Sequence, residues 1–180
     1  VKSRIGVDDQ NPDKVLPEFI TKVANSGCSV FIIHARKALL KGLSPKDNRT
    51  IPPLQYPLVY EMQKNFPGLD IILNGGLTEL KEMKSCVKNR VAGVMIGREA
   101  YQNPSILLNV DNEIFDQKEK VRSMRDVIRN MIEYCKREKS EGTPIRGILK
   151  HLKGAFKGRA NSKEFKRVLF CNETTDLEKL

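Results

Sequence analysis

Residues 71–76 read Ile-Ile-Leu-Asn-Gly-Gly, a short apolar run that ends in a polar side chain and two glycines, and this stretch decides the fold. Three more apolar runs end in a similar way: residues 1–6, 30–33 and 91–96. Helical patterns separate these runs: residues 14–26, 56–66 and 79–88. Thr78 is expected to cap the last of these helices. Strands and helices that alternate at this spacing predict parallel β/α units.

The number of these units predicts an incomplete barrel. Four units occupy the residues up to 111, whereas a complete (β/α)₈ TIM barrel takes about 250 residues. Four strands alone would leave two unpaired sheet edges. We therefore expect residues 1–111 to be the C-terminal half of a TIM barrel. The chain opens at Val1, inside a strand and without an initiator Met, as expected of a fragment.

The strand pattern disappears after Asp111, and residues 112–180 predict a small all-α domain. A long amphipathic helix is expected over residues 117–139, and a second helix over residues 145–157. The residues Gly142-Thr143-Pro144 separate the two. The first helix should direct one set of apolar side chains inward: Val121, Met124, Val127, Ile128, Met131 and Ile132.

Composition favours a polyanionic partner. Lys and Arg total 32 against 22 Asp and Glu, for a net charge of +10. No apolar run is long enough to span a bilayer, and no signal peptide is present. The four cysteines (Cys28, Cys86, Cys135 and Cys171) have neither disulfide nor zinc-site spacing. We expect a cytoplasmic or organellar monomer without metal and without membrane contact.

Polar and glycine residues at the strand ends predict a cofactor site, because barrel active sites lie at the carboxyl ends of the strands. The candidates are Lys2, His34, Asn74, Gly75, Gly76, Gly97 and Arg98. Glycines let backbone N–H groups approach a phosphate, and a guanidinium can donate a pair of hydrogen bonds to it. Ordinary glycine turns, a surface arginine and a structural histidine are the alternative reading.

Two basic segments predict contact with nucleic acid. The long loop of residues 36–53 holds five basic side chains and the single acid Asp47: Arg36, Lys37, Lys41, Lys46 and Arg49. Residues 146–167 hold eight basic residues against one acid, Glu164. Arg146, Lys150, Lys153 and Lys157 recur at helical spacing there, which predicts one stripe that could follow a phosphate backbone. A solvated basic surface is the alternative. His151 lies within the stripe and is expected to pack or to touch RNA.

These residues resemble the tRNA-dihydrouridine synthases, most closely the A-type branch. The resemblance covers nearly the whole chain, and its motifs are residues 1–6 with 8–10, 34–37 with 42–49, 74–76 and 97–104. The resemblance implies an FMN-dependent enzyme that reduces D-loop uridine in tRNA to 5,6-dihydrouridine, with NADPH as reductant. Hydride would pass from the flavin to uracil C6, and a cysteine would protonate C5.

The resemblance also implies residue roles. Lys2 and His34 would contact FMN, while Asn74 to Gly76 and Gly97-Arg98 would hold its phosphate. Lys46 and Arg49 match tRNA-contacting positions, as do Lys163 and Lys166, where A-type members usually carry arginine. Lysine keeps the charge there but loses the bidentate geometry. Arg146, Lys150 and Lys153 complete the expected tRNA surface.

The family's catalytic cysteine lies upstream of the matched region, and none of the four cysteines here matches it. We expect no catalytic residue in this chain, and no activity from it alone. Two alternatives stay open: a non-catalytic RNA-binding fragment, and another flavin-dependent TIM-barrel oxidoreductase. An upstream Asn-x-x-Cys-Pro segment would exclude the first, and the basic helical tail argues against the second.

Overall fold

The computed structural model describes residues 1–118 and 120–170. The chain divides into two compact units, Val1–Gly97 and Arg98–Leu180. The sequence predicts a domain boundary at residues 111/112, and the two units meet earlier in the chain, at Gly97 and Arg98.

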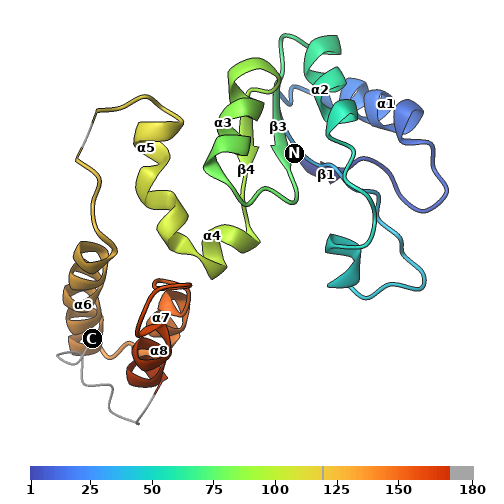
Figure 1. Ribbon diagram of the computed structural model, residues 1–180. Coiled ribbons are helices and arrows are strands. Elements are labelled where there is room, and N and C mark those ends of the chain that lie inside the picture. Colours follow the sequence, from blue (N-terminus) through green and yellow to red (C-terminus); the bar gives the residue numbers. More distant parts are fainter. Residues whose placement is uncertain (119, 171–180) are drawn as a thin grey trace. The chain divides into compact units, whose positions relative to one another are not determined.

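The first unit contains a four-stranded sheet (Figure 1). Its strands are β1 (Lys2–Arg4), β2 (Val30–His34), β3 (Asp70–Asn74) and β4 (Gly93–Met95). They are hydrogen-bonded in chain order, and every pair is parallel. The prediction of parallel β/α units is therefore confirmed.

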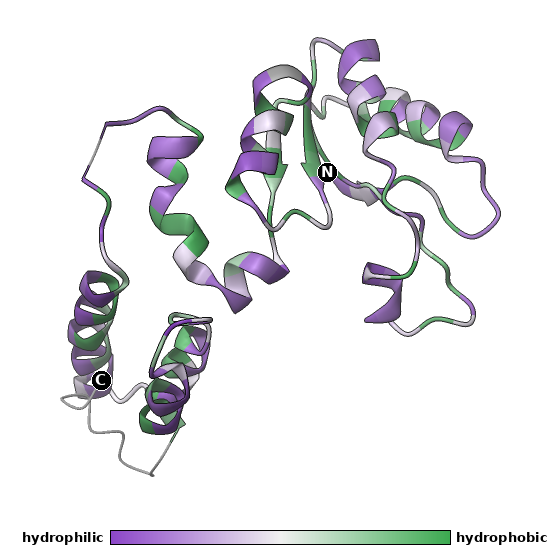
Figure 2. Cartoon of the chain, in the orientation of Figure 1, coloured by the Kyte–Doolittle hydropathy of each residue, from purple (hydrophilic) through white to green (hydrophobic). Residues whose placement is uncertain are grey.

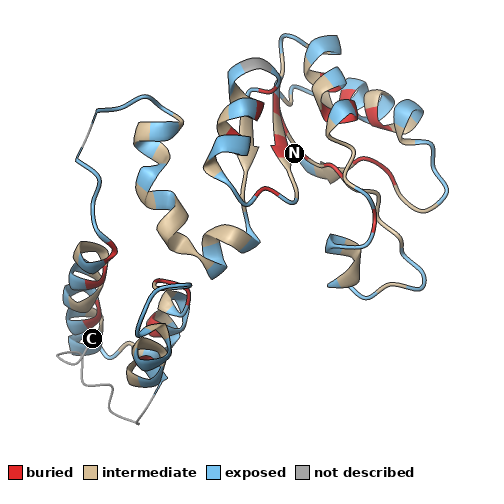
Figure 3. Cartoon of the chain, in the orientation of Figure 1, coloured by how far each residue is buried: buried red, intermediate tan, exposed pale blue. Residues whose placement is uncertain are grey.

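Helices α1 (Pro12–Ala24), α2 (Tyr56–Asn65) and α3 (Leu80–Asn89) follow the first three strands. Apart from the strands, these helices supply most of the buried side chains of the first unit (Figure 3). They therefore pack against the sheet face whose strand residues are buried. The fully buried strand residues on that face are Phe31, Ile33, Ile71 and Leu73. The alternate residues are exposed or half-buried: Lys2, Arg4, Ile32, His34, Ile72 and Asn74.

Local hydrogen bonds set where these helices begin. The Asn11 side chain accepts the Asp13 N–H at 3.0 Å, so α1 begins at Pro12, two residues earlier than the apolar pattern suggests. The predicted cap at Thr78 is wrong. Glu79 occupies the N-cap of α3, in extended conformation and without a side-chain hydrogen bond.

The described part of the second unit is helical. It contains α4 (Arg98–Gln102), α5 (Val110–Glu113), α6 (Met124–Ser140), α7 (Arg146–Leu149), α8 (Ser162–Phe170) and 3₁₀ segments at Pro104–Asn109 and Lys150–Leu152. A further 3₁₀ turn, Asp47–Arg49, lies in the first unit.

Both helix predictions for this unit need correction. Helix α6 begins at Met124 and not at residue 117, because Ser123 and Asp126 form a reciprocal capping box. Val121 precedes that cap and is 43% exposed, so it does not point inward. The single helix predicted over residues 145–157 is also wrong: α7 has four residues, and a 3₁₀ turn and further turns follow it. Gly147 and Gly154 disfavour a continuous helix there.

Apolar side chains from α6, α7, α8 and the segment around Ala155 form the core of the second unit. Figure 2 colours the apolar residues along the chain green. Two adjoining clusters of buried residues make it up: Cys135, Leu149 and Leu169, then Met124, Ile128 and Ala155. The rings of Phe156 and Phe165 meet edge to face at 4.7 Å beside the second cluster. Within residues 1–118 and 120–170, no helix is long and apolar enough to cross a membrane.

Candidate cofactor and RNA-binding sites

The carboxyl ends of the strands align in one row. The sheet register pairs Arg4 with His34, His34 with Asn74, and Asn74 with Met95. Alternate strand residues share a face, so these side chains lie on the face opposite the helices. The structure therefore brings His34 and Asn74 together at one edge of the sheet.

Lys2 is not at this edge. It opens β1 and pairs with Ile32, two residues before the row that contains His34. The strand-end position that corresponds to His34 belongs to Arg4, which the sequence analysis did not select. Counting two residues along the strand from Lys2 would have found Arg4, because a strand has a side-chain period of two. Lys2 and Arg4 share a face, so Lys2 lies one layer deeper.

The glycine pair after β3 forms a tight turn that has no room for side chains. Gly75 has φ +115° and Gly76 has φ +73°, values that favour glycine. A Cβ at Gly75 would lie 2.5 Å from Cδ2 of His34, and one at Gly76 would lie 2.5 Å from Cδ1 of Leu54. The His34 ring therefore packs directly against the backbone of Gly75.

Hydrogen bonds on both sides fix this turn. The Asn74 amide donates to the Met95 carbonyl at 2.8 Å, which joins the ends of β3 and β4. The Tyr56 hydroxyl donates to the Gly75 carbonyl at 2.5 Å. Burial, with Glu82 and Cys86 nearby, raises the pKa of Tyr56 to about 12 and keeps the phenol protonated. Tyr56 was missed in the sequence because nothing there connects it with the glycines.

These groups fit a phosphate. A Cβ at Gly97 would meet open space, so the backbone after β4 is also accessible. Glycine backbones at the ends of two adjacent strands can approach an anion closely. Arg98 follows Gly97 directly and begins α4, the first element of the second unit. The cofactor roles of the seven candidate residues stay predictions.

The basic loop of residues 36–53 is held from inside by two arginines. The Arg4 guanidinium donates to the carbonyls of Lys37 at 2.7 Å and Asn48 at 2.8 Å. The Arg36 guanidinium donates to the carbonyls of Thr50 and Pro52. Burial, with Arg49 and Arg36 nearby, lowers the pKa of Arg4. Arg36 thus serves the loop's own backbone, although the charge pattern of the loop predicts it among the side chains for nucleic acid.

Asn48 completes the loop. Its amide donates to the Leu39 carbonyl at 2.6 Å, and its oxygen accepts the Leu39 N–H at 2.8 Å. The 3₁₀ turn Asp47–Arg49 therefore has a fixed position within the loop. Lys46 and Arg49, the predicted tRNA contacts, lie at this turn with exposed side chains.

The basic residues of the second unit do not form the predicted single helical stripe. Arg146, Lys150 and Lys153 are exposed, but they lie on α7, the 3₁₀ turn and the turn after it. Lys157 is paired with Glu99 at 3.6 Å. On α8, Lys163 is exposed and Lys166 is half-buried. These positions stay predictions for tRNA contact.

The described cysteines offer no candidate acid at the strand ends. Cys28 lies before β2, at the amino end of the sheet, and its thiol contacts the Val30 carbonyl at 3.4 Å. Cys86 and Cys135 are buried in helices. All three are free thiols. Cys171 lies outside the described residues. In the same described ranges, no group of three or more His, Cys, Asp or Glu side chains could hold a metal ion.

A parallel sheet connected by helices, with glycine turns and polar side chains at the carboxyl ends of its strands, defines the class of this protein as α/β. Comparison with known proteins narrows this class. The profile of the dihydrouridine synthase family, Dus, matches residues 1–179. The chain therefore belongs to the dihydrouridine synthase family.

Curated relatives share this assignment. The chain is 48% identical over 173 residues to the tRNA-dihydrouridine(20/20a) synthase of Escherichia coli K12, covering 96% of this chain and 50% of the relative. The enzyme of the same name from Vibrio cholerae is 46% identical over 168 residues, covering 93% of this chain and 51% of the relative. That from Pasteurella multocida is 44% identical over 172 residues, covering 96% and 52%. The chain spans about half the length of the curated relatives it matches.

Proposed function

We propose that this chain is the C-terminal part of an FMN-dependent tRNA-dihydrouridine synthase, and that the whole protein reduces uridines 20 and 20a of tRNA with NADPH as reductant. Positions 20 and 20a are those in the names of the relatives, to which this chain is 44–48% identical. The parallel sheet of this chain would be completed to a (β/α)₈ barrel by the rest of the protein. We also propose that the whole protein is cytoplasmic.

One observation supports the cofactor assignment: neighbouring strands end at a shared edge in His34, in Asn74 and in Met95. Two glycines follow Asn74 directly, and Gly97 and Arg98 follow Met95 after one residue. In the proposed enzyme, the glycine backbones and Arg98 bind the FMN phosphate, and His34 lies against the same turn. Lys2, one layer deeper on the same face, places a positive charge beside the isoalloxazine ring. When bound, FMN supplies the hydride that reduces the 5,6-double bond of uridine.

The RNA would bind through the two basic surfaces. The ordered turn at Asp47–Arg49 presents Lys46 and Arg49 to phosphates. Arg146, Lys150, Lys153, Lys163 and Lys166 supply the second surface. A loop uridine leaves its stack at low cost, so it can reach a flavin at the strand ends. The proton donor to C5 is expected outside this chain.

The test uses the full-length protein and tRNA from a strain that lacks its gene. The proposal predicts that the purified protein carries flavin, and that adding protein and NADPH forms dihydrouridine at positions 20 and 20a. Replacing Lys46 and Arg49 together by alanine should weaken tRNA binding and leave flavin content unchanged. The matched control replaces the exposed Lys14 and Lys22 of α1 by alanine. A colourless protein, or a strain whose tRNA retains its dihydrouridine, would refute the proposal.

A further inference from the structure

Three contacts join the short helix α4 to the basic segment of residues 151–157. Both segments lie in the second compact unit. Helix α4 begins with Arg98, the residue proposed to bind the FMN phosphate. The segment follows Lys150 and contains Lys153, two residues of the surface proposed to bind tRNA.

The first contact is between backbones. A Cβ at Gly154 would lie 2.5 Å from the Gln102 carbonyl oxygen and 2.8 Å from that of Tyr101. Only glycine allows this approach, since real Cβ atoms almost never come within 3.0 Å of such atoms. Gly154 therefore sets how closely the segment packs on the end of α4.

The second contact joins two rings. The Tyr101 hydroxyl lies 3.2 Å from Nδ1 of His151, and the two rings meet edge to face with centroids 5.7 Å apart. An edge-to-face arrangement is a favourable geometry for aromatic rings. From the sequence, His151 is expected to pack or to contact RNA. In the structure it has a specific partner on α4, Tyr101.

The third contact is an ion pair at the first turn of α4. Lys157 Nζ lies 3.6 Å from Glu99, whose side chain is only 14% exposed. The Asn103 amide also donates to Glu99, at 2.9 Å. Glu99 is the residue next to Arg98, so this pair restrains the backbone from which the Arg98 side chain extends.

We propose that Glu99, Tyr101, His151, Gly154 and Lys157 are positioning residues for Arg98, and that through them tRNA binding and FMN binding strengthen each other. Helix α4 has five residues and cannot hold its place by its own hydrogen bonds. Its orientation depends on the segment 151–157, and RNA that binds Lys150 and Lys153 would order that segment. Thermodynamic linkage then requires that FMN tighten tRNA binding by the same factor as tRNA tightens FMN binding. This inference rests on the proposed function.

The experiment measures FMN dissociation constants of the full-length protein by flavin fluorescence, with and without saturating tRNA. We expect tRNA to tighten FMN binding by roughly tenfold, within the range usual for coupled sites. In Gly154→Ala, FMN alone should bind roughly tenfold more weakly, and the tRNA effect should disappear. Gly147→Ala is the control, because a Cβ there meets nothing within 4 Å. It should keep both the wild-type FMN affinity and the tRNA effect.

A second variant covers the case in which Gly154→Ala does not fold. Tyr101→Phe with Lys157→Gln removes the hydroxyl and the ion pair without adding atoms to the packed interface. It should reduce the tRNA effect on FMN affinity and keep cooperative thermal unfolding. The inference fails if wild type binds both ligands without mutual effect, or if folded variants keep the full effect. If wild type binds no FMN or no tRNA, the proposed function fails.

Discussion

Replacing Arg4 with methionine should release the basic loop of residues 36–53. The Arg4 guanidinium donates to two loop carbonyls, those of Lys37 and Asn48, at 2.7 and 2.8 Å. A hydrogen bond from a charged donor contributes about 1.5–3 kcal/mol, and half-exposure favours the lower end of this range. The two bonds together therefore stabilise the closed loop by about 3 kcal/mol.

Repulsion offsets part of this gain. Burial lowers the pKa of Arg4, and the nearby charges of Arg49 and Arg36 lower it further, so removing the Arg4 charge relieves repulsion among the three guanidinium groups. Allowing about 1 kcal/mol for this relief leaves a net loss of about 2 kcal/mol. The open loop should then be populated roughly thirtyfold more often.

Limited proteolysis of the full-length protein measures the opening directly. The loop carries trypsin sites at Arg36, Lys37, Lys41, Lys46 and Arg49. When opening and closing are fast, the cleavage rate follows the open population, so Arg4→Met should be cut in the loop roughly thirtyfold faster. Lys14→Met is the control, since it removes an exposed charge from α1, away from the loop and from the proposed cofactor site. Equal loop cleavage in the two variants would show that Arg4 does not hold the loop.

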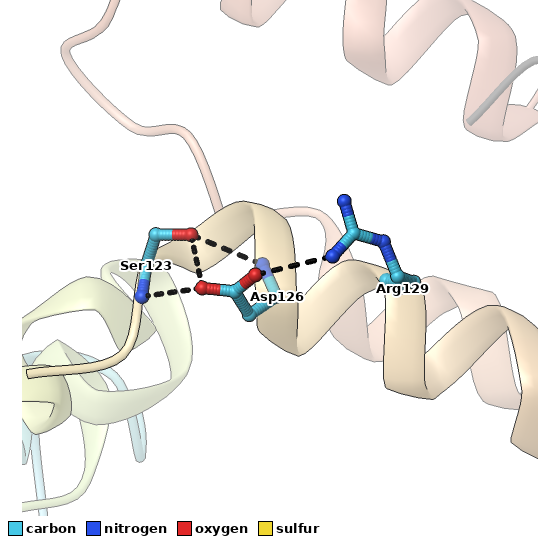
Figure 4. A network of polar contacts seen from close by, with 3 residues as sticks. All are labelled: Ser123, Asp126 and Arg129. Carbon is cyan, nitrogen blue, oxygen red and sulfur yellow. Dashed lines mark hydrogen bonds and ion pairs between the residues drawn. The ribbon is translucent and has the colours of Figure 1, made fainter.

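Three further predictions concern the turn, a helix cap and a phenol. Gly75→Ala should lower the free energy of unfolding by about 2–4 kcal/mol and reduce the flavin content, because φ +115° and a Cβ 2.5 Å from His34 both oppose alanine. Denaturant melts and flavin absorbance measure these effects, and Gly68→Ala, with nothing within 4 Å of its Cβ, is the control. Ser123→Ala should cost about 1 kcal/mol of stability at neutral pH. Hydrogen bonds from Ser123 lower the pKa of Asp126 from 3.8 (Figure 4). The part of the difference that comes through the Asp126 carboxylate is therefore present above pH 3.8 and is lost as the pH falls through the lowered pKa, while the bond from the Asp126 N–H to the Ser123 hydroxyl oxygen remains. A mutant–wild-type difference that does not shrink in acid melts would count against the carboxylate's part in the box. Tyr56→Phe should cost about 1 kcal/mol. Burial raises the pKa of Tyr56 from 10.0 to about 12. The stability difference between wild type and Tyr56→Phe should therefore be constant below pH 10.0 and shrink as the pH rises to about 12. A difference that persists through that range would contradict the hydrogen bond from the Tyr56 hydroxyl to Gly75.

The parallel sheet could be predicted because its signal is local and repeated. Each strand is a short apolar run, and each helix between them has an apolar face and a clear stop. The register that aligns His34 with Asn74 follows once the strands are parallel. Lys2 was placed wrongly because β1 consists of the polar residues Lys2–Arg4, so no apolar run marks where this strand ends, and an error of two residues exchanged Lys2 for Arg4.

The second unit was harder to predict because tertiary contacts decide its helices. Residues 145–157 have helical spacing of apolar and basic side chains. The α-helix nevertheless ends at Leu149, and the backbone at Gly154 packs on that of Gln102. No short-range sequence pattern indicates this contact between Gly154 and Gln102. The start of α6, in contrast, could have been found, because Ser123 followed by Asp126 is a short-range cap signal.

The flavin content of Arg98→Ala in the full-length protein tests the central claim most directly. That claim is that the strand ends at Asn74–Gly76 and Gly97-Arg98 bind the phosphate of FMN. Lys64→Ala, an exposed charge in the last turn of α2, is the control. We expect wild type and Lys64→Ala to purify with matching flavin absorbance, and Arg98→Ala, still folded, to lose most of it. Equal flavin in all three proteins would show that Arg98 does not bind the cofactor.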